Sequence, residues 1–399
     1  MKLFVITFIC LVLIVGKTYS QQMRVFSLDG ATLTKVRTAI QANSKEYKQA
    51  YKKLLRDAEK ALAVAPVSVM DKAQIPTSGD KHDYMSLARY FWPDTSKPDG
   101  LPYINKDGET NPEVESITDR KNVEVNTNNA WNLALAYFFS GEEKYAEKSS
   151  ILLRTWFLDM ATKMNPNLNF GQIVKGKEGG RPSGLIEMRS LIKVVDIIGL
   201  LAGSASWTEA DQKGMTTWFE QYFQWLNENS IGVKEAGTTN NHGTWLCAQK
   251  IAIALFLDKK EMATQLSNEA KEKVIATQIT PEGEQPRELA RTRSLHYTHF
   301  NLEAMFTLAS FAKSAGVDLW NYQTEDGRSI RKALDWVLPV VTGDKKWEAK
   351  QIDDFKMAKF YEVLYQASVE FKDAHYADIA SQIDGEDAVK EQVNLFFAK

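Results

Sequence analysis

The sequence Thr238-Thr239-Asn240-Asn241-His242-Gly243-Thr244-Trp245 opens a long apolar run that extends to Leu257. Thr and Asn are favoured at helix starts because their side-chain oxygens accept hydrogen bonds from the unpaired N–H groups of the first turn. The pattern therefore predicts a loop that delivers Asn241 and His242 to the mouth of a buried helix. There an amide and an imidazole would lie beside the positive end of the helix dipole, a place suited to a carboxylate. An ordinary helix cap with an unused histidine fits this stretch equally well.

Helical periodicity extends over most of the chain. Apolar residues at three- and four-residue spacing predict helices at 33–64, 131–139, 145–160, 185–202, 209–229, 245–257, 260–277, 295–315, 329–341, 353–371 and 373–383. No stretch shows strand-like alternation of any length. The helices come in pairs, and pairs that each hide one face must stack side by side. Because the short repeat motif of an open solenoid is missing, we predict an all-α fold, an (α/α) toroid with long loops over a cleft.

The region from about 66 to 126 is rich in Pro and Gly and breaks the helical pattern. It contains Lys81-His82-Asp83-Tyr84 and Arg89-Tyr90-Phe91-Trp92-Pro93-Asp94, which are too aromatic for a disordered segment. A long irregular stretch inside a compact protein is usually functional. We interpret it as an ordered, lid-like loop layer over the cleft. A second irregular stretch, at 165–184, carries Arg181.

Residues 1–20 have the pattern of a secretory signal peptide, with Lys2, an apolar segment at 3–15 and small residues before Gln21. The apolar segment is too short for a membrane span. We therefore expect a bacterial protein that is periplasmic or secreted, without a membrane anchor, with residues 21–399 forming a single domain. Once Cys10 is removed, Cys247 has no partner for an internal disulfide, and we expect it to pack in the core.

The composition narrows the choice of partners. A formal net charge of −2 argues against nucleic-acid binding, which calls for a basic excess. Aromatic residues make up 11% of the chain, with 10 Trp and 14 Tyr. Aromatic rings in exported proteins often stack on sugars, although core packing is an equally ordinary role for Trp. No cluster has the spacing of a metal site.

A second dense group of functional side chains lies between Pro286 and His299. It contains three arginines, two histidines and a tyrosine: Arg287, Arg291, Arg293, His296, His299 and Tyr297. If the segment is helical, Arg293 and Tyr297 share a face. If the helix begins only near Thr292, this argument does not reach Arg291. The alternative is a surface helix whose arginines pair with nearby glutamates.

Together with Asn241 and His242, this segment suits β-elimination in a polyuronate chain. A carboxylate next to an acidic C–H must be neutralised before the proton leaves, and Asn, His and Arg donors serve this purpose. A tyrosine whose pKa is lowered by neighbouring Arg and His can then take the C5 proton. Loss of the O4-linked sugar completes the reaction.

These segments resemble the alginate lyase superfamily of helical-toroid polysaccharide lyases, from about residue 25 to residue 371. The most specific parts are Asn241-His242 ahead of Trp245, the Arg-x-Arg…Tyr segment, and the loop with His82–Leu87, Trp92–Asp94 and Lys97–Tyr103. The resemblance implies an incomplete (α/α) toroid, a barrel of paired helices. It also implies an exported enzyme that cleaves mannuronate- or glucuronate-containing chains with no required metal or cofactor.

The resemblance also implies residue roles. Asn241 and an arginine would neutralise the carboxylate, His242 would assist or act as base, and Tyr297 would act as acid and base. The family arginine is expected seven residues before the tyrosine, where this chain has Ala290, so we favour Arg291 and then Arg293. The predicted substrate-binding residues are Lys81, His82, Tyr84, Arg89, Asn129, Trp131, Arg181, Asn240, Trp245, Arg293 and His299.

Several alternatives stay open. The favoured substrate is alginate that contains mannuronate, cleaved by a monomeric enzyme, with glucuronan as the alternative. Tyr297 alone suits a syn elimination, whereas an anti elimination needs a second group such as His242. A glycoside hydrolase on the same ring needs two facing carboxylates, for which Asp83, Asp94, Glu187 and Glu288 are available. A non-catalytic periplasmic glycan-binding protein needs the loops but not Tyr297.

Overall fold

The computed structural model describes residues 23–384 and 391–397, so the expected signal peptide at 1–20 lies outside the described residues. The helices are α1 (Gly30–Gln41), α2 (Lys48–Leu62), α3 (Asp119–Ser140), α4 (Glu143–Phe157), α5 (Leu191–Leu200), α6 (Glu209–Glu228), α7 (Ser230–Glu235), α8 (Asn241–Phe256), α9 (Lys260–Ala270), α10 (Pro286–Leu289), α11 (Ser294–Ser314), α12 (Ile330–Val341), α13 (Tyr361–Glu370) and α14 (Ala374–Asp384). Short 3₁₀ helices include η3 (Pro182–Ser190), η5 (Met357–Phe360) and η7 (Gln392–Leu395).

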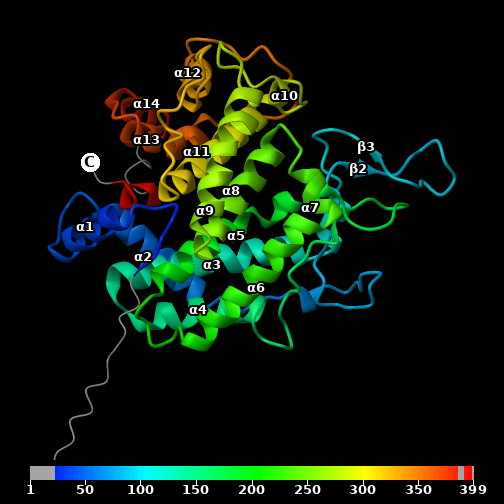
Figure 1. Cartoon of the computed structure of the whole chain (residues 1–399), viewed down its shortest axis with the longest axis horizontal. Helices are drawn as coiled ribbons and strands as arrows, with labels where there is room; N and C mark the ends of the chain where they lie inside the picture. The colour runs from blue at the N-terminus through cyan, green and yellow to red at the C-terminus, as the bar shows by residue number, and fades with distance from the viewer. Residues whose placement is uncertain (1–22, 385–390, 398–399) are drawn as a thin grey trace, which may run out of the picture.

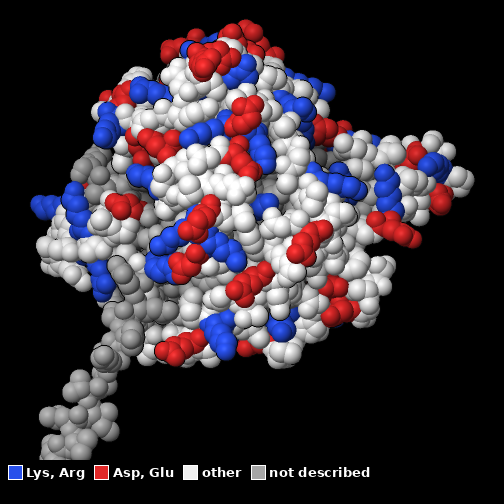
Figure 2. Space-filling model, in the orientation of Figure 1, with Lys and Arg blue, Asp and Glu red and all other residues white. Residues whose placement is uncertain are grey.

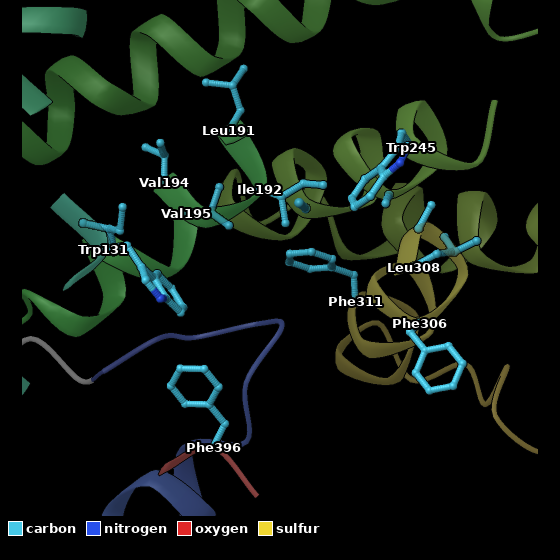
Figure 3. Packing of buried hydrophobic residues seen from close by; sticks show 14 of the residues in the cluster. Trp131, Leu191, Ile192, Val194, Val195, Trp245, Phe306, Leu308, Phe311 and Phe396 are labelled. Carbon is cyan, nitrogen blue, oxygen red and sulfur yellow. The ribbon is translucent and has the colours of Figure 1, made fainter. Parts of the chain in front are cut away.

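The helices form an incomplete toroid of paired helices, as predicted (Figure 1). The inner helices α3, α5, α8, α11 and α13 are neighbours in that order, and α4, α9, α12 and α14 each pack behind the inner helix next to them in sequence. Side chains of α5, α8 and α11 point into the same hydrophobic layer, as Ile192, Trp245 and Phe311 show in Figure 3. This layer holds the inner ring together.

The C-terminal segment completes the ring between α13 and the N-terminal helices. Here η7 contacts both α2 and α13. The Gln392 side chain donates to Asn132 Oδ1 at 2.8 Å, and the Phe396 ring lies edge-on to Trp131 with centroids 5.9 Å apart. The segment, red in Figure 1, therefore joins α13 to α3.

The loop layer contains strands that the sequence did not reveal. Strand β1 (Met85–Leu87) pairs in parallel with β4 (Phe170–Ile173), and β2 (Phe91–Trp92) pairs antiparallel with β3 (Ile104–Asn105). Strands β2 and β3 project from the helical body (Figure 1). With two to four residues each, they escape a pattern search that needs longer alternation.

Two predicted helix boundaries are wrong. The single helix expected at 33–64 is two helices, because Asn43 adopts a left-handed conformation with φ of 59° and turns the chain between α1 and α2. The irregular region expected to reach residue 126 ends earlier, where α3 begins at Asp119. Among the described residues, no helix is both long and apolar enough to cross a membrane.

A buried ion pair attaches the loop layer to the ring. Lys72 Nζ lies 2.9 Å from Asp119 Oδ2, and neither side chain is exposed to solvent. Lys72 also donates to the carbonyls of Val69 and Lys81, and Asp119 accepts from the backbone N–H of Met85 at 2.9 Å. Burial lowers the pKa of Lys72 and raises the pKa of Asp119 to about 6. Each charge therefore depends on the other to remain ionised.

We predict that Lys72→Met lowers the free energy of unfolding by about 3–5 kcal/mol, because it leaves the Asp119 carboxylate buried without its cation. Lys60→Met is the matched control, since Lys60 makes only an exposed pair with Asp57 at 3.6 Å, worth at most about 1 kcal/mol. Chemical denaturation of both variants measures the difference. Equal losses would show that the Lys72–Asp119 pair has no special role.

Candidate active site

A cavity of about 1070 Å³ lies between the loop layer and the inner helices. It is lined by residues of all five inner helices, mostly from their N-terminal halves. The four residues predicted to be catalytic all contribute to its wall: Asn241, His242, Arg291 and Tyr297. Two stretches about fifty residues apart in sequence thus meet at one site.

Asn241 is fixed by a buried carboxylate. Its backbone N–H donates to Glu288 Oε1 at 2.7 Å and its Nδ2 donates to Oε2 at 2.8 Å, with Asn241 fully buried and Glu288 1% exposed. Asn240 caps α8, since its side chain accepts from the N–H of His242 at 3.2 Å. Asn241 Oδ1 has no hydrogen-bond partner among the described residues. The amide is held in place with part of its hydrogen-bonding capacity unused.

His242 is oriented by Glu235, the last residue of α7. His242 Nδ1 lies 2.7 Å from Glu235 Oε1, and the Glu235 side chain is 2% exposed. A carboxylate at this distance favours the hydrogen on Nδ1, which leaves Nε2 as the acceptor nitrogen. An imidazole held in this way is suited to act as a base.

Arg291 is clamped between the loop layer and Tyr297. Its Nε and Nη2 donate to Asp107 Oδ1 at 3.0 and 2.5 Å, and its guanidinium carbon lies 3.7 Å from the centre of the Tyr297 ring. Thr292 also donates to Asp107 through its N–H and hydroxyl. Asp107 therefore fixes the arginine from the loop that follows β3.

The Tyr297 hydroxyl lies 2.7 Å from the hydroxyl of Tyr90, which comes from the loop layer. Burial raises the pKa of Tyr297, the neighbouring Tyr90 raises it further, and Arg291 offsets only part of this rise. The predicted lowering of this pKa by Arg and His is therefore wrong, because desolvation outweighs the cation. Tyr297 is protonated at neutral pH and is ready to donate a proton.

Two further arginines that were predicted to bind substrate, Arg89 and Arg181, lie at the cavity. Arg181 lies over the Phe91 ring at 4.6 Å, and Arg89 lines the same wall. Among the described residues, neither has a carboxylate within ion-pair distance, and Arg89 Nε is buried without a partner. The face in Figure 2 carries basic and acidic side chains interspersed. Attraction for an anion therefore comes from the cavity rather than from that surface.

Other predicted substrate-binding residues also line the cavity. Asn240 and Trp245 lie near His242 on α8, and Trp131 contributes from α3. The Trp245 ring packs 5.4 Å from Phe300, and both indoles are 8% exposed. They present small apolar areas to the cavity and otherwise belong to the core.

Three predictions in the loop layer are wrong. Tyr84 is completely buried, and its hydroxyl donates to Glu187 at 2.8 Å. His82 Nδ1 donates to the carbonyl of Lys163 at 2.6 Å, and Lys81 contributes its carbonyl to the Lys72 site. None of the three lines the cavity. They build the base of the loop layer, while Arg89 and Tyr90, a few residues later, reach the site.

Three predictions on the helices are also wrong. Arg293 forms an ion pair with Asp353 at 2.5 Å and does not line the cavity, whereas Arg291 does. His299 is 3% exposed, with Nε2 2.9 Å from the carbonyl of Lys359. Asn129 does not line the cavity, whereas Asn128 does. One helical position turns a side chain by about 100°, so the two adjacent asparagines of α3 face different directions.

The four carboxylates predicted as candidates for a hydrolase are engaged in structural roles. Glu187 accepts from Tyr84 and from Ser86 at 2.6 Å, and Asp83 accepts from Ser78, Asn165 and Asn167. Asp94 caps a turn through Ser96, and Glu288 holds Asn241. Among the described residues, no group of three His, Cys, Asp or Glu side chains is placed to hold a metal ion. Cys247 packs against the core, and burial raises its pKa to about 12.

Tyr90, Asp107 and Glu235 were not predicted as site residues, and Glu288 was considered only as a carboxylate available to a hydrolase. Tyr90 belongs to the aromatic stretch Arg89–Asp94, but Asp107 and Glu235 are separated from their partners by loops whose paths cannot be predicted from the sequence. Only contacts in space identify them.

Comparisons with known proteins agree on one family. A family model described as alginate lyase matches residues 68–347. A crystal structure of an alginate lyase from Bacteroides ovatus is 40% identical, with a TM-score of 0.89, and the alignment covers 94% of this chain and 99% of that one. Alginate lyase A1-III from Sphingomonas species A1 shares the fold, at 17% identity and a TM-score of 0.59 over 95% and 97% of the two chains.

Among curated proteins, an alginate lyase from Pseudomonas syringae pv. syringae is 26% identical over 154 residues. That alignment covers 37% of this chain and 39% of the relative.

We predict that Asp107→Asn lowers the free energy of unfolding by about 1–3 kcal/mol near neutral pH, since it removes a carboxylate that accepts charge-assisted hydrogen bonds. Burial works against ionisation, but the donors on Arg291 and Thr292 hold the pKa of Asp107 below its ordinary value. Because the pKa of Asp107 is lower in the folded state than in the unfolded state, its carboxylate stabilises the fold above about pH 4. This contribution is lost as the pH falls further.

The gap in stability between wild type and Asp107→Asn should therefore narrow between pH 6 and pH 3. Thermal unfolding across this range measures it, with the exposed Asp378→Asn as control. A gap that stays constant with pH would contradict the assignment.

Proposed function

This chain belongs to the alginate lyase family, and from this premise we propose that it cleaves a polyuronate, first of all mannuronate-containing alginate, by β-elimination. The observation that carries the proposal is the convergence of Asn241, His242, Arg291 and Tyr297 on one cavity. Glucuronan on the same scaffold is the alternative substrate. The residues supply a neutralising cation, an oriented imidazole and a protonated hydroxyl, which are the three groups that elimination requires.

Neutralisation of the substrate carboxylate is the first requirement, because it makes the C5–H acidic. Arg291 keeps Nη1 free of protein hydrogen bonds within the described residues, while Asp107 holds its other side. Asn241 lies at the positive end of α8 with its amide fixed by Glu288. A fixed cation and a fixed dipole stabilise the enolate-like intermediate without reorganising during the reaction.

Because burial keeps Tyr297 protonated, proton transfer is then divided between two side chains. On mannuronate, where the C5 proton and O4 lie syn, both side chains must act on the same face of the sugar. His242 Nε2 takes the C5 proton as the double bond forms between C4 and C5. The C4–O4 bond breaks, and Tyr297 donates its hydroxyl proton to the leaving O4. The protonated resting state of Tyr297 supports its role as the acid, and Glu235 stabilises the imidazolium that forms on His242. A proton passed from His242 to the tyrosinate, through Tyr90 or solvent, restores the site.

Every role in this scheme is filled by a side chain, so the proposal requires no metal or cofactor. We also propose that the protein is exported and acts as a monomer on an acidic polysaccharide outside the cytoplasm. The signal-like pattern at 1–20 supports export.

The test of the function is ultraviolet absorbance during incubation with polymannuronate, polyguluronate and glucuronan. Elimination leaves a double bond conjugated to the carboxylate, whereas hydrolysis leaves none. We expect absorbance to rise on polymannuronate. New reducing ends without a rise in absorbance would show that the protein is a hydrolase and not a lyase. No product of either kind would favour a glycan-binding role.

We predict that Tyr297→Phe lowers kcat by at least about 100-fold, because it removes the proton donor, while the affinity for the polymer is kept. Tyr322→Phe is the matched control, since Tyr322 packs beside Lys271 away from the cavity. Initial rates and calorimetric titration with the polymer measure the two quantities. Full activity in Tyr297→Phe would remove Tyr297 from the mechanism.

A further inference from the structure

The cavity continues far beyond the catalytic groups, along a single face of α11. From Tyr297 inward, the lining residues of this helix include Phe300, Glu303, Thr307 and Ser310. Their spacing of three or four residues places them on one face. At 1.5 Å per residue, the distance from Tyr297 to Ser310 is about 20 Å. The cavity is therefore a well that descends along the toroid axis.

We call the deep part of this well the inner chamber. It is lined by polar side chains from four inner helices and by aromatic rings: Asn128, Trp131, Lys193, Glu303, Phe306, Thr307, Ser310, Glu362, Gln366 and Phe396. The aromatic side chains are almost completely buried, with Phe306 1% and Phe396 7% exposed. The walls of the chamber are therefore partly polar and partly aromatic.

The charges in the inner chamber are opposite to those at the mouth. At the mouth, Arg89 and Arg181 have no carboxylate partner among the described residues. In the chamber, Glu303 and Glu362 come with one cation, Lys193, which is bonded to Asn128 at 3.2 Å. Two further cations act on Glu303: Arg189, which is paired with Glu124 at 3.3 Å, and Lys359, which does not line the cavity. The lining of the inner chamber thus carries two carboxylates and one cation.

The two chamber carboxylates are accessible from the cavity. The Glu303 side chain is 41% exposed and lies 3.6 Å from His299 Nδ1, and Glu362 is also exposed. Both lie on inner helices and line the well, so they are exposed toward its interior. Within the described residues, Glu362 makes no hydrogen bond or ion pair. Burial raises the pKa of both groups, that of Glu303 to about 7 against the opposing effect of Arg189, Lys359 and Lys193. Repulsion by Glu303 adds to the rise at Glu362.

We propose that Glu303 and Glu362 are specificity-determining residues that stop a uronate chain from entering the inner chamber. This inference rests on the proposed function. A uronate held by Arg291 places its neighbours on one side of the scissile bond in the well. Further uronates in that direction meet two carboxylates in a confined space, where like charges repel more strongly than in water. The chain halts above Glu303, and the depth of the well above it fixes the length of the product.

The test compares product lengths from polymannuronate for wild type and Glu303→Gln/Glu362→Gln, at pH 8 so that Glu303 is ionised in the wild type. Both substitutions keep side-chain shape and remove only charge. We expect wild type to give one dominant short product and the double variant to give products longer by one or more uronates. Mass spectrometry of the end products measures the lengths, and circular dichroism confirms folding.

Glu261→Gln/Glu325→Gln is the matched control, since it removes the same charge from two exposed sites outside the cavity. Its products should equal those of wild type. Identical products from the chamber variant and wild type would overturn the inference while leaving the lyase activity in place, and so would an equal shift in the control. A wild-type protein that cleaves no polyuronate would instead remove the proposed function.

Discussion

The site depends on the two hydrogen bonds that Asn241 donates to Glu288. One buried carboxylate accepts from both the backbone and the side chain of the residue that begins α8. It thereby fixes the start of that helix, the direction of the amide and, through the next residue, the position of His242. Since Glu288 itself lies just before the arginine and tyrosine segment, the same contact sets the spacing between the two halves of the site. The contact between Glu288 and Asn241 therefore both stabilises the fold and positions the catalytic groups.

The helices of the toroid determine the electrostatic environment of the Glu288–Asn241 contact. Inner helices present mainly their N-terminal halves to the well, so their dipoles favour an anion at the mouth. Asp107 and Tyr90 then bring the loop layer onto Arg291 and Tyr297. The catalytic groups are thus held from two directions, by the ring below and by the loops above. Neither layer alone would orient them.

The sequence was sufficient for the parts that depend on local pattern. Paired helices, the helix start at Asn240 and the arginine-tyrosine segment are local, and the structure bears out the toroid. The sequence was insufficient where burial determines whether a residue can reach the site. Tyr84 and His299 look like site residues in the sequence, yet both are enclosed by segments distant in the chain. The predicted lowering of the Tyr297 pKa was wrong for the same reason, because desolvation depends on the whole folded structure.

The C-terminal segment bridges the gap of the incomplete toroid, and this has a consequence for folding. The N-terminal stretch bonds to Asp196 through Phe26 and Ser27, and the segment at 391–397 bonds across to α3. Residues from both extremes of the described chain thus lock the same ring. The helical hairpins can form one at a time from segments that are neighbours in sequence, but the ring cannot be bridged until residues 391–397 reach α2, α3 and α13. Bridging of the ring therefore requires that the segments at both ends of the described chain be in place together.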